Sequence, residues 1–241
     1  MLAPVASSTL PAATTAVEAV VEALLAEILR GNFPPGTRLP AEREMARMLG
    51  ASRPTLREAL RRLGEWNLVE PRRGSGIVVR PRSEWTIEVL PAFLRYGRPP
   101  DGTTTLAMLR DLLTLRRTLI RTIVELIATR MPAGGTAAAR AQVERAWAAR
   151  DRPAAFVHED FLVMRAVVEA TGFLPAVWML NRIAGVYLDI ATVVTVRVPD
   201  HYVASAIGYL DALDARDGAT AAARIDAYLD RHDAAMLGAS S

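Results

Sequence analysis

The sequence predicts a mainly α-helical protein in two parts: an N-terminal winged helix-turn-helix with a small β-wing, and a C-terminal bundle of six or seven helices. Apolar residues recur at helical spacing through most of the chain. Two of the expected helices are joined by a turn of only a few residues, and a glycine-bearing hairpin follows them. From about residue 104 to residue 238 the sequence shows no convincing strand alternation.

Composition indicates a globular chain and excludes several kinds of site. Hydrophobic residues make up 51% of the chain and four residues are Trp, which is enough for a packed core. Cysteine is absent, which excludes disulfides, thiolate metal sites and a cysteine nucleophile. No apolar run approaches the roughly 20 residues that a membrane span needs, and the first fifteen residues lack the positive start of a secretory signal. We therefore expect a cytoplasmic protein with no membrane partner.

Positive charge is concentrated in one stretch of the chain. The net charge is only +3, yet residues 38–82 contain 11 Arg against 5 Glu, so the rest of the chain has a net charge of −3. Every basic residue is Arg, whose planar guanidinium stays charged and can donate two parallel hydrogen bonds. A local basic stretch of this kind indicates a DNA-binding surface.

Three helices are expected in the N-terminal part, after a flexible Ala/Ser/Thr/Pro tail over residues 1–15. The first covers 16–30, where Val, Leu and Ile recur at helical spacing. A Pro- and Gly-rich turn separates it from a second helix over 40–50, which ends at a glycine. Ser52 is the expected N-cap of a third helix that extends to about Trp66.

The third helix has a basic face and an apolar face. Arg53 and Arg57 lie one turn apart near its start. A DNA major groove admits one α-helix, and Arg can donate two hydrogen bonds to guanine, so these two residues are the best candidates for base contacts. Arg61 and Arg62 could contact phosphates or lie on the solvent-exposed surface. The apolar face is assigned to the core and consists of Leu56, Leu60 and Leu63.

The remaining elements complete a division into four segments. Two β-prone runs, 68–70 and 77–79, flank an Arg-Arg-Gly-Ser-Gly turn and predict a hairpin wing. The DNA-binding domain is therefore expected over 16–82. Residues 83–103 are rich in Pro, Gly and charge, and are expected to form a linker with one short docking helix. An all-helical domain is expected over 104–238.

Six helices are expected in the C-terminal part, because Pro and Gly separate its apolar periodic segments. They are 104–130, 136–150, 153–171, 174–196, 200–216 and 218–237. The fourth of these is apolar nearly all round, which predicts a helix buried at the centre of the bundle, although its Val-rich end could alternatively be extended.

The GntR family of bacterial transcription regulators has a winged helix-turn-helix that closely resembles the stretch ILRGNFPPGTRLPAEREMARMLGASRPTLREALRRLGEWNLVEPRRGSGIVV. The helical C-terminal half is similar to the sensing (FCD-type) domain of the FadR branch of that family. The resemblance implies a homodimer that binds an inverted-repeat operator in double-stranded DNA, with repression relieved by a small-molecule effector. The DNA contacts that it implies are Arg43, Ser52, Arg53, Thr55 and Arg57, and at the wing tip Arg73, Gly74 and Gly76.

Many sensing domains of the FadR branch bind a divalent metal ion through one Asp and three His, and this chain departs from that pattern. With Gly172 aligned to the family's glycine, the Asp position is Asp160, but the three His positions are Met164, Ala206 and Tyr228. A divalent ion bound by imidazole and carboxylate needs three or four such ligands. We therefore expect no metal ion and no other cofactor.

The effector is then expected to be held by side chains and apolar surface alone. Arg116 could pair with a carboxylate or phosphate of the effector, or form a surface or interhelical salt bridge. Met and Ala in place of imidazoles make the pocket more apolar, which favours a larger effector such as the acyl thioesters sensed by metal-free relatives. The three histidines, His158, His201 and His232, are expected to be surface or capping residues. The expected effector-binding residues are Arg116, Asp160, Met164, Asn181, Ala206 and Tyr228.

Two alternative functions belong to other classes. An enzyme could use His158-Glu159-Asp160, but consecutive helical residues point in different directions, and the sequence shows no Ser/His/Asp constellation or phosphate-binding glycine loop. No catalytic residue is therefore assigned. A ligand-independent regulator or architectural DNA-binding protein, with a degenerate sensing domain, would have a collapsed core around Met164 and Tyr228.

Overall fold

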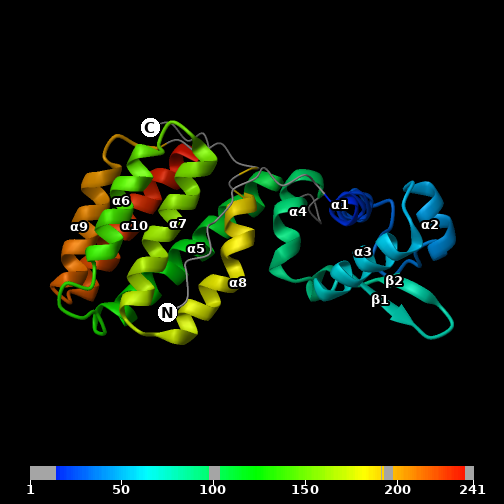
Figure 1. Cartoon of the computed structure of the whole chain (residues 1–241), viewed down its shortest axis with the longest axis horizontal. Coiled ribbons are helices and arrows are strands. Elements are labelled where there is room, and N and C mark those ends of the chain that lie inside the picture. The colour runs from blue at the N-terminus through cyan, green and yellow to red at the C-terminus, as the bar shows by residue number, and fades with distance from the viewer. Residues whose placement is uncertain (1–14, 98–103, 191, 193–197, 237–241) are drawn as a thin grey trace, which may run out of the picture. The chain divides into compact units, whose positions relative to one another are not determined.

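The chain divides into two compact units, one ending at Arg98 and the other beginning at Pro99 (Figure 1). The computed structural model describes residues 15–97, 104–190, 192 and 198–236. Apart from Thr15, the expected flexible tail lies outside the described residues, as does the end of the expected linker, 98–103. Within the described residues no helix is both long and apolar enough to cross a membrane.

The first unit begins with three helices, α1 (Ala16–Leu29), α2 (Glu42–Met48) and α3 (Arg53–Glu65). Thr15 and Glu18 form a capping box at the start of α1, because the Thr15 hydroxyl accepts from the Glu18 backbone N–H at 3.2 Å and the Glu18 carboxylate accepts from that of Thr15 at 2.8 Å. The predicted cap of α3 is present, since Ser52 Oγ accepts from the Thr55 backbone N–H at 3.2 Å. The three helices bury a common apolar core that includes Leu24, Ile28, Met45, Leu56 and Leu63.

A β-hairpin follows α3, as predicted. Strands β1 (Val69–Arg72) and β2 (Gly76–Val79) pair antiparallel, with Val69 opposite Val79 and Arg72 opposite Gly76. An isolated bridge between Arg38 and Val78 joins the segment before α2 to the outer side of β2. The base of the hairpin is therefore fixed to the helices, and its tip extends from them.

The short helix α4 (Leu90–Tyr96) is packed on α1, after the 3₁₀ turns η1 (Arg82–Glu84) and η2 (Ile87–Val89). Tyr96 Oη donates to the Glu22 carboxylate at 2.8 Å, and Arg95 Nη1 donates to it at 3.2 Å. The Arg30 guanidinium lies 5.1 Å from the centre of the Tyr96 ring. The helix expected within the linker thus belongs to the first unit.

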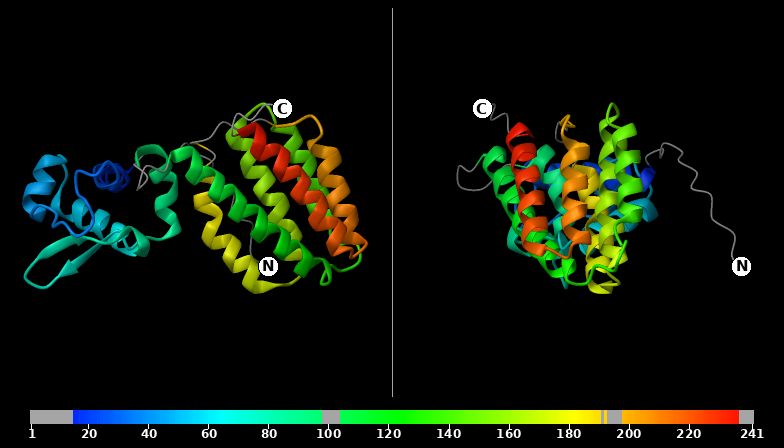
Figure 2. Two further views of the ribbon diagram at one scale, coloured as in Figure 1. Left: turned by 180° about the vertical axis from the view of Figure 1, so that it is seen from behind. Right: turned by 90° about the vertical axis from the view of Figure 1, so that its left-hand side faces the viewer.

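The second unit contains six helices within its described residues (Figure 2). In packing order, α5 contacts α10, α10 contacts α9, α9 contacts α6, α6 contacts α7, and α7 contacts α8. This series encloses an apolar core that includes Ile127, Phe156, Tyr202 and Leu210. The helices are α5 (Thr105–Ala128), α6 (Ala137–Ala148), α7 (Pro153–Ala170), α8 (Leu174–Ile190), α9 (Tyr202–Asp214) and α10 (Gly218–Met236).

The expectation that the fourth C-terminal helix is central is wrong. That helix, α8, packs mainly on α7 and buries only Ala176, Leu180 and Val186. Its Trp178 remains 65% exposed, because among the described residues of the second unit no helix packs on this side of α8 as α7 does on the other. The end of the predicted segment, residues 191 and 193–197 with its Val-rich alternative, lies outside the described residues.

Candidate functional site

The exposed face of α3 presents two arginines in different states. Arg53 and Arg57 are four residues apart, so their side chains emerge on one side of the helix. Arg57 Nε donates to Glu42 Oε2 of α2 at 2.8 Å. Arg53 is exposed and, within the described residues, has no ion-pair partner. Its guanidinium can therefore bind an anion or a base edge without first breaking a salt bridge.

Arg61 and Arg62, left open by the sequence, are held close to acidic neighbours on the same helix. Arg61 donates to Glu58 at 2.6 Å and also forms an ion pair with Glu65. Its hydrogen bonds to Glu58, together with the nearby Glu65 carboxylate, raise the pKa of Arg61 further above its usual value. Arg62 lies 3.8 Å from Glu58. Both charges are thus compensated on the helix itself.

The N-terminus of α3 is ordered by side chains that the sequence assigned to DNA. The hydroxyls of Ser52 and Thr55 are 2.7 Å apart, so each fixes the rotamer of the other. The N–H groups of Thr55 and Leu56 both donate to Ser52, and Pro54 has no N–H, so the cap satisfies this turn within the protein. Arg43 on α2 is exposed and has no ion-pair partner within the described residues.

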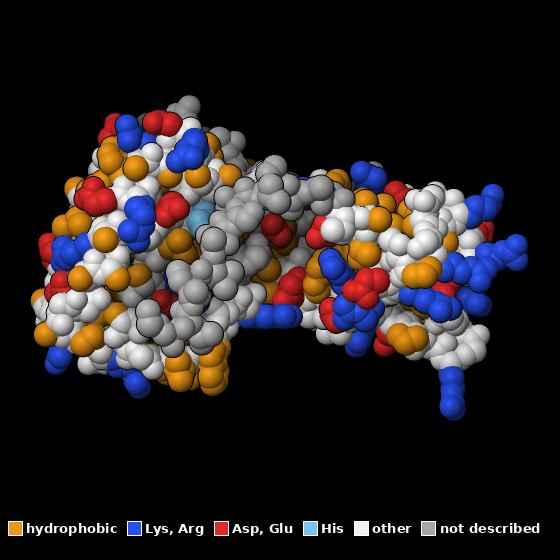
Figure 3. Space-filling view, viewed as in Figure 1, with side chains coloured by type: hydrophobic (Ala, Val, Ile, Leu, Met, Phe, Trp, Pro, Cys, Tyr) orange, Lys and Arg blue, Asp and Glu red, His pale blue; other side chains and the backbone are white. Residues whose placement is uncertain are grey.

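The hairpin tip has the backbone conformation that glycine permits. Gly74 and Gly76 have φ of +74° and +75°, and Arg73 beside them is exposed. A Cβ at Gly76 would lie 3.0 Å from Nε of Arg38, so glycine also allows the Arg38 side chain to pack against the hairpin. Arg38 was not among the predicted contacts, although it begins the basic stretch. Basic side chains gather over the end of the unit that contains α2 and the hairpin (Figure 3).

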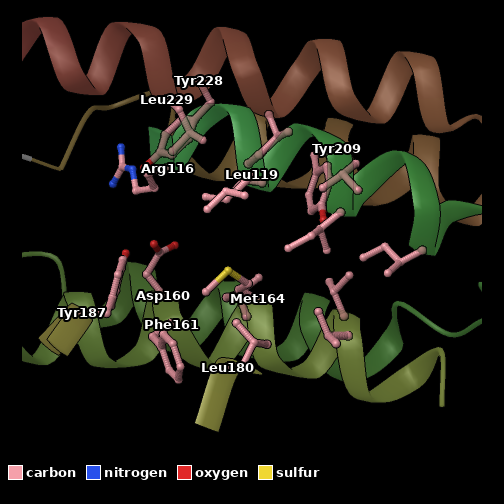
Figure 4. A pocket seen from close by; sticks show the side chains of 18 of the residues that line it. Arg116, Leu119, Asp160, Phe161, Met164, Leu180, Tyr187, Tyr209, Tyr228 and Leu229 are labelled. Carbon is pink, nitrogen blue, oxygen red and sulfur yellow. The ribbon is translucent and has the colours of Figure 1, made fainter. Parts of the chain in front are cut away.

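The second unit contains a cavity of about 250 Å³ between α5, α10 and α9 on one side and α7 and α8 on the other. The apolar part of its wall includes Leu119, Ile123, Val167, Leu180 and Ile225. The predicted effector residues Arg116, Asp160, Met164, Ala206 and Tyr228 all line it. Figure 4 shows Arg116, Asp160, Tyr187 and Tyr228 at one end, whereas Leu119, Met164 and Leu180 continue the wall away from them.

Asp160 is the acidic group of the cavity wall. Its carboxylate accepts a hydrogen bond of 2.7 Å from Tyr202 Oη. Burial raises the pKa of Asp160, and the Tyr202 hydrogen bond and the positive charge of Arg116 only partly oppose this. The same burial, with the nearby Asp160 charge, raises the pKa of Tyr202, Tyr228 and Tyr187, so all three hydroxyls stay protonated and can donate.

Arg116 forms an interhelical salt bridge, which is one of the two alternatives left open by the sequence. Its Nη2 is ion-paired with Asp233 of α10. Asp233 is 5% exposed and does not line the cavity, so it compensates the guanidinium from behind the wall. Arg116 Nε and Asp233 Oδ2 are both buried without a hydrogen-bond partner among the described residues.

Two expectations about polar residues around the cavity are corrected. Asn181 is exposed on α8 and does not line the cavity, because its neighbour Leu180 takes the inward position. His232 is half-buried, and its ring stacks on Tyr228 with 6.0 Å between the ring centres. Burial, together with the positive charge of Arg116, lowers the pKa of His232 to about 4. His158 and His201 are exposed, as expected.

No three His, Cys, Asp or Glu side chains come together as a metal site within the described residues. His158 and Asp160 also point to different surroundings, one to solvent and one to the cavity. The cavity therefore offers hydrogen-bonding groups and apolar surface at which a small molecule can bind.

Sequence reasoning missed Tyr187, Tyr202 and Asp233. The two tyrosines gave no signal beyond helical periodicity. For Asp233 the sequence did contain a signal. Three acidic residues recur at helical spacing on α10, namely Asp226, Asp230 and Asp233, and two consecutive arginines, Arg116 and Arg117, lie on α5. Arg117 is paired with Asp226 at 3.1 Å and also with Asp230, so the acidic face of α10 meets the basic pair of α5.

Comparison with known proteins gives matches over both units. A family model described as "Bacterial regulatory proteins, gntR family" matches residues 16–79. The HTH-type transcriptional regulator Mce2R of Mycobacterium tuberculosis is 38% identical over 114 residues, 47% of this chain and 46% of that one. The fatty acid metabolism regulator protein of Cronobacter sakazakii is 31% identical over 171 residues, 70% of this chain and 68% of that one. The chain thus spans about half the length of Mce2R.

A solved structure shares the fold of the chain. It is that of Lar, described as controlling the expression of the Listeria monocytogenes agr system, and it matches with a TM-score of 0.57 at 15% identity, over 94% of this chain and 98% of that one. At so low an identity the likeness concerns the fold alone.

Proposed function

Because the chain belongs to the gntR family of bacterial regulatory proteins, as its winged helix-turn-helix predicted, we propose that it is a transcription regulator that binds double-stranded DNA through its first unit. It binds an inverted-repeat operator as a homodimer and represses transcription. A small-molecule effector occupies the cavity of the second unit without a metal ion and relieves the repression. The polarity of the response is an expectation from the family.

The observation that supports DNA binding best is the free guanidinium of Arg53 at the capped start of α3. A recognition helix reads base edges with the side chains of its first turns, and the cap fixes where that turn begins. Arg43 and Arg73, each exposed and without an ion-pair partner in the described part of the chain, add positive charge for phosphates on either side.

Two arginines of α3 provide a matched test. We expect Arg53→Ala to weaken binding to the operator by about 10- to 100-fold, which corresponds to the loss of one bidentate base contact. Arg61→Ala, which removes the same side chain from a position already paired with Glu58 and Glu65, should change the affinity little. Fluorescence anisotropy with labelled DNA from upstream of the coding sequence measures both. Equal losses for the two variants would contradict the assignment of α3 as the recognition helix.

The dimer is supported by exposed apolar side chains on two helices of the second unit. Large apolar residues gathered on one surface of a soluble protein usually mark an interface. On α8, Trp178 is 65% exposed, and on α5, Leu115 is 55% exposed. We propose that a second copy of the chain covers them. The set on this surface is Leu115, Leu119 and Leu126 on α5, and Leu174, Trp178 and Met179 on α8.

Control by an effector is supported by the open cavity around Met164 and Tyr228. A ligand-independent protein with a degenerate sensing domain would have these residues in a collapsed core, whereas they line a space of about 250 Å³. Its wall is mostly apolar, and the relative from Cronobacter sakazakii is named a fatty acid metabolism regulator. We therefore propose an effector with an extended apolar body.

The polarity of the response is tested by titrating a candidate effector into the complex of the protein with its operator. Release of the DNA in a gel-shift assay is expected. An effector that strengthens operator binding would overturn the repressor assignment, and the absence of thermal stabilisation by any cellular metabolite would favour the ligand-independent alternative.

A further inference from the structure

The charge of Arg116 is not free to bind an anionic effector. Its guanidinium lines the cavity, but its Nη2 is ion-paired with Asp233, which lies behind the wall and is 5% exposed. An anionic ligand beside Arg116 would add a second negative charge to a guanidinium that Asp233 already neutralises. Displacing Asp233 instead would break a buried ion pair, which is strongly unfavourable.

The charge of Asp160 is the one left uncompensated at the cavity wall. Its carboxylate accepts a hydrogen bond of 2.7 Å from Tyr202 Oη, which is a neutral donor. The positive charge of Arg116 lies on the opposite wall, but Arg116 is already paired with Asp233. When ionised, Asp160, Asp233 and Arg116 together have a net charge of −1. The other titratable groups around this end of the cavity are Tyr187, Tyr228 and His232.

Aromatic side chains line the same cavity as this carboxylate. Tyr202 and Tyr228 are in edge contact with 6.1 Å between their ring centres, and Phe161 and Tyr187 are 5.4 Å apart. All four residues line the cavity, and Figure 4 shows Asp160, Tyr187 and Tyr228 around the same end. The faces of aromatic rings attract cations, most strongly where water is excluded. A carboxylate among aromatic rings, at the end of an apolar cavity, is complementary to an ammonium group.

We propose that the effector is a hydrophobic amine, in which an apolar body lies along Leu119, Met164 and Leu180 and a protonated amino group pairs with Asp160. This inference rests on the proposed function, because it assigns the chemistry of the effector to the same cavity. The ammonium group pairs with Asp160 and lies among the rings of Tyr187, Tyr202 and Tyr228. An uncharged or anionic head group supplies no positive partner, and burial then favours the protonated form of Asp160, whose pKa is raised.

The test measures how tightly three ligands of equal chain length bind to the whole protein. Octylamine, 1-octanol and octanoate differ only in a cationic, neutral or anionic head group, and isothermal titration calorimetry measures their binding. We expect octylamine to bind at least tenfold more tightly than either of the others. Octanol or octanoate binding as tightly as octylamine overturns the amine inference and leaves the effector cavity in place. No binding by any of the three argues against both.

Three variants show whether the carboxylate is responsible. Asp160→Asn retains an acceptor for Tyr202 and is expected to lower the affinity for octylamine at least tenfold, while octanol binds as before. Asp233→Asn releases Arg116 and is expected to raise the affinity for octanoate severalfold. Asp189→Asn, at an exposed position of α8, is the matched control and should change nothing. An octylamine affinity that Asp160→Asn leaves unchanged, or an octanoate affinity that Asp233→Asn leaves unchanged, overturns the charge assignment.

Discussion

Replacement of His232 by Phe should make the stability of the protein less sensitive to acid. The imidazole is half-buried on α10 and stacks on Tyr228 at an angle of 16° between the rings. Burial and the positive charge of Arg116 lower its pKa to about 4. A phenyl ring keeps the stacking area and cannot be protonated, so the variant isolates the contribution of this one group.

The size of the effect follows from the difference between the folded and unfolded pKa values. An unfolded histidine takes up a proton near pH 6.5, whereas folded His232 does so only near pH 4. Between these values the unfolded state binds more protons, so the free energy of unfolding falls as the pH falls from about 6.5 to about 4 and changes no further below that. At pH 5 the expected loss from this group is about 2 kcal/mol.

Urea denaturation followed by circular dichroism at 222 nm, at pH 7.5 and pH 5.0, measures this difference. Between pH 7.5 and pH 5.0 the free energy of unfolding of the native protein should fall by about 2 kcal/mol more than that of His232→Phe. The matched control His158→Phe, at an exposed position of α7, should behave like the native protein. If the native protein and His232→Phe lose equal stability, or if the His232 Cε1 proton resonance titrates near pH 6.5, the reasoning fails.

Three further predictions concern the ion pair, the apolar face and the hairpin. Arg116→Met should lower the free energy of unfolding, measured by urea denaturation, by about 3–5 kcal/mol, because Asp233 stays buried without its partner. The double variant with Asp233→Leu should recover most of this stability. A double variant no more stable than Arg116→Met would contradict the prediction. Leu115→Glu and Trp178→Glu should each convert the dimer to a monomer, as measured by light scattering after size-exclusion chromatography. An unchanged mass for both variants would show that the apolar surface of α5 and α8 is not the dimer interface. Gly76→Ala should lower operator affinity more than Gly74→Ala, because both have positive φ but only a Cβ at Gly76 meets Arg38, at 3.0 Å; equal losses would remove Arg38 from the explanation.

The first unit was predictable because its signals are local. The cap by Ser52, the spacing of Arg53 and Arg57 and the glycines of the hairpin tip each determine a conformation within a few residues. The state of each arginine was not predictable in the same way. The partner of Arg57 is Glu42, on another helix, and only the folded chain brings the two side chains within 2.8 Å.

The second unit was predictable in its helices but not in how they face one another. An apolar pattern all round α8 indicated central burial, yet periodicity reports hydrophobicity and does not tell whether the covering surface belongs to the same chain. Asn181 was assigned to the cavity although Leu180 points there, because one residue along a helix turns the side chain by about 100°. The Arg116–Asp233 pair joins residues far apart in the sequence, for which spacing gives no register.

Leu119 and Met179 both line the cavity and also belong to the exposed apolar surface of α5 and α8, where their exposed fractions are 51% and 42%. In the proposed dimer these two side chains would touch the partner on one side and the effector on the other. A ligand that shifts them changes the free energy of association, and by linkage association changes the affinity for the ligand by the same factor. Measured effector affinity would then depend on protein concentration, so the sensor would report its own abundance together with that of its ligand.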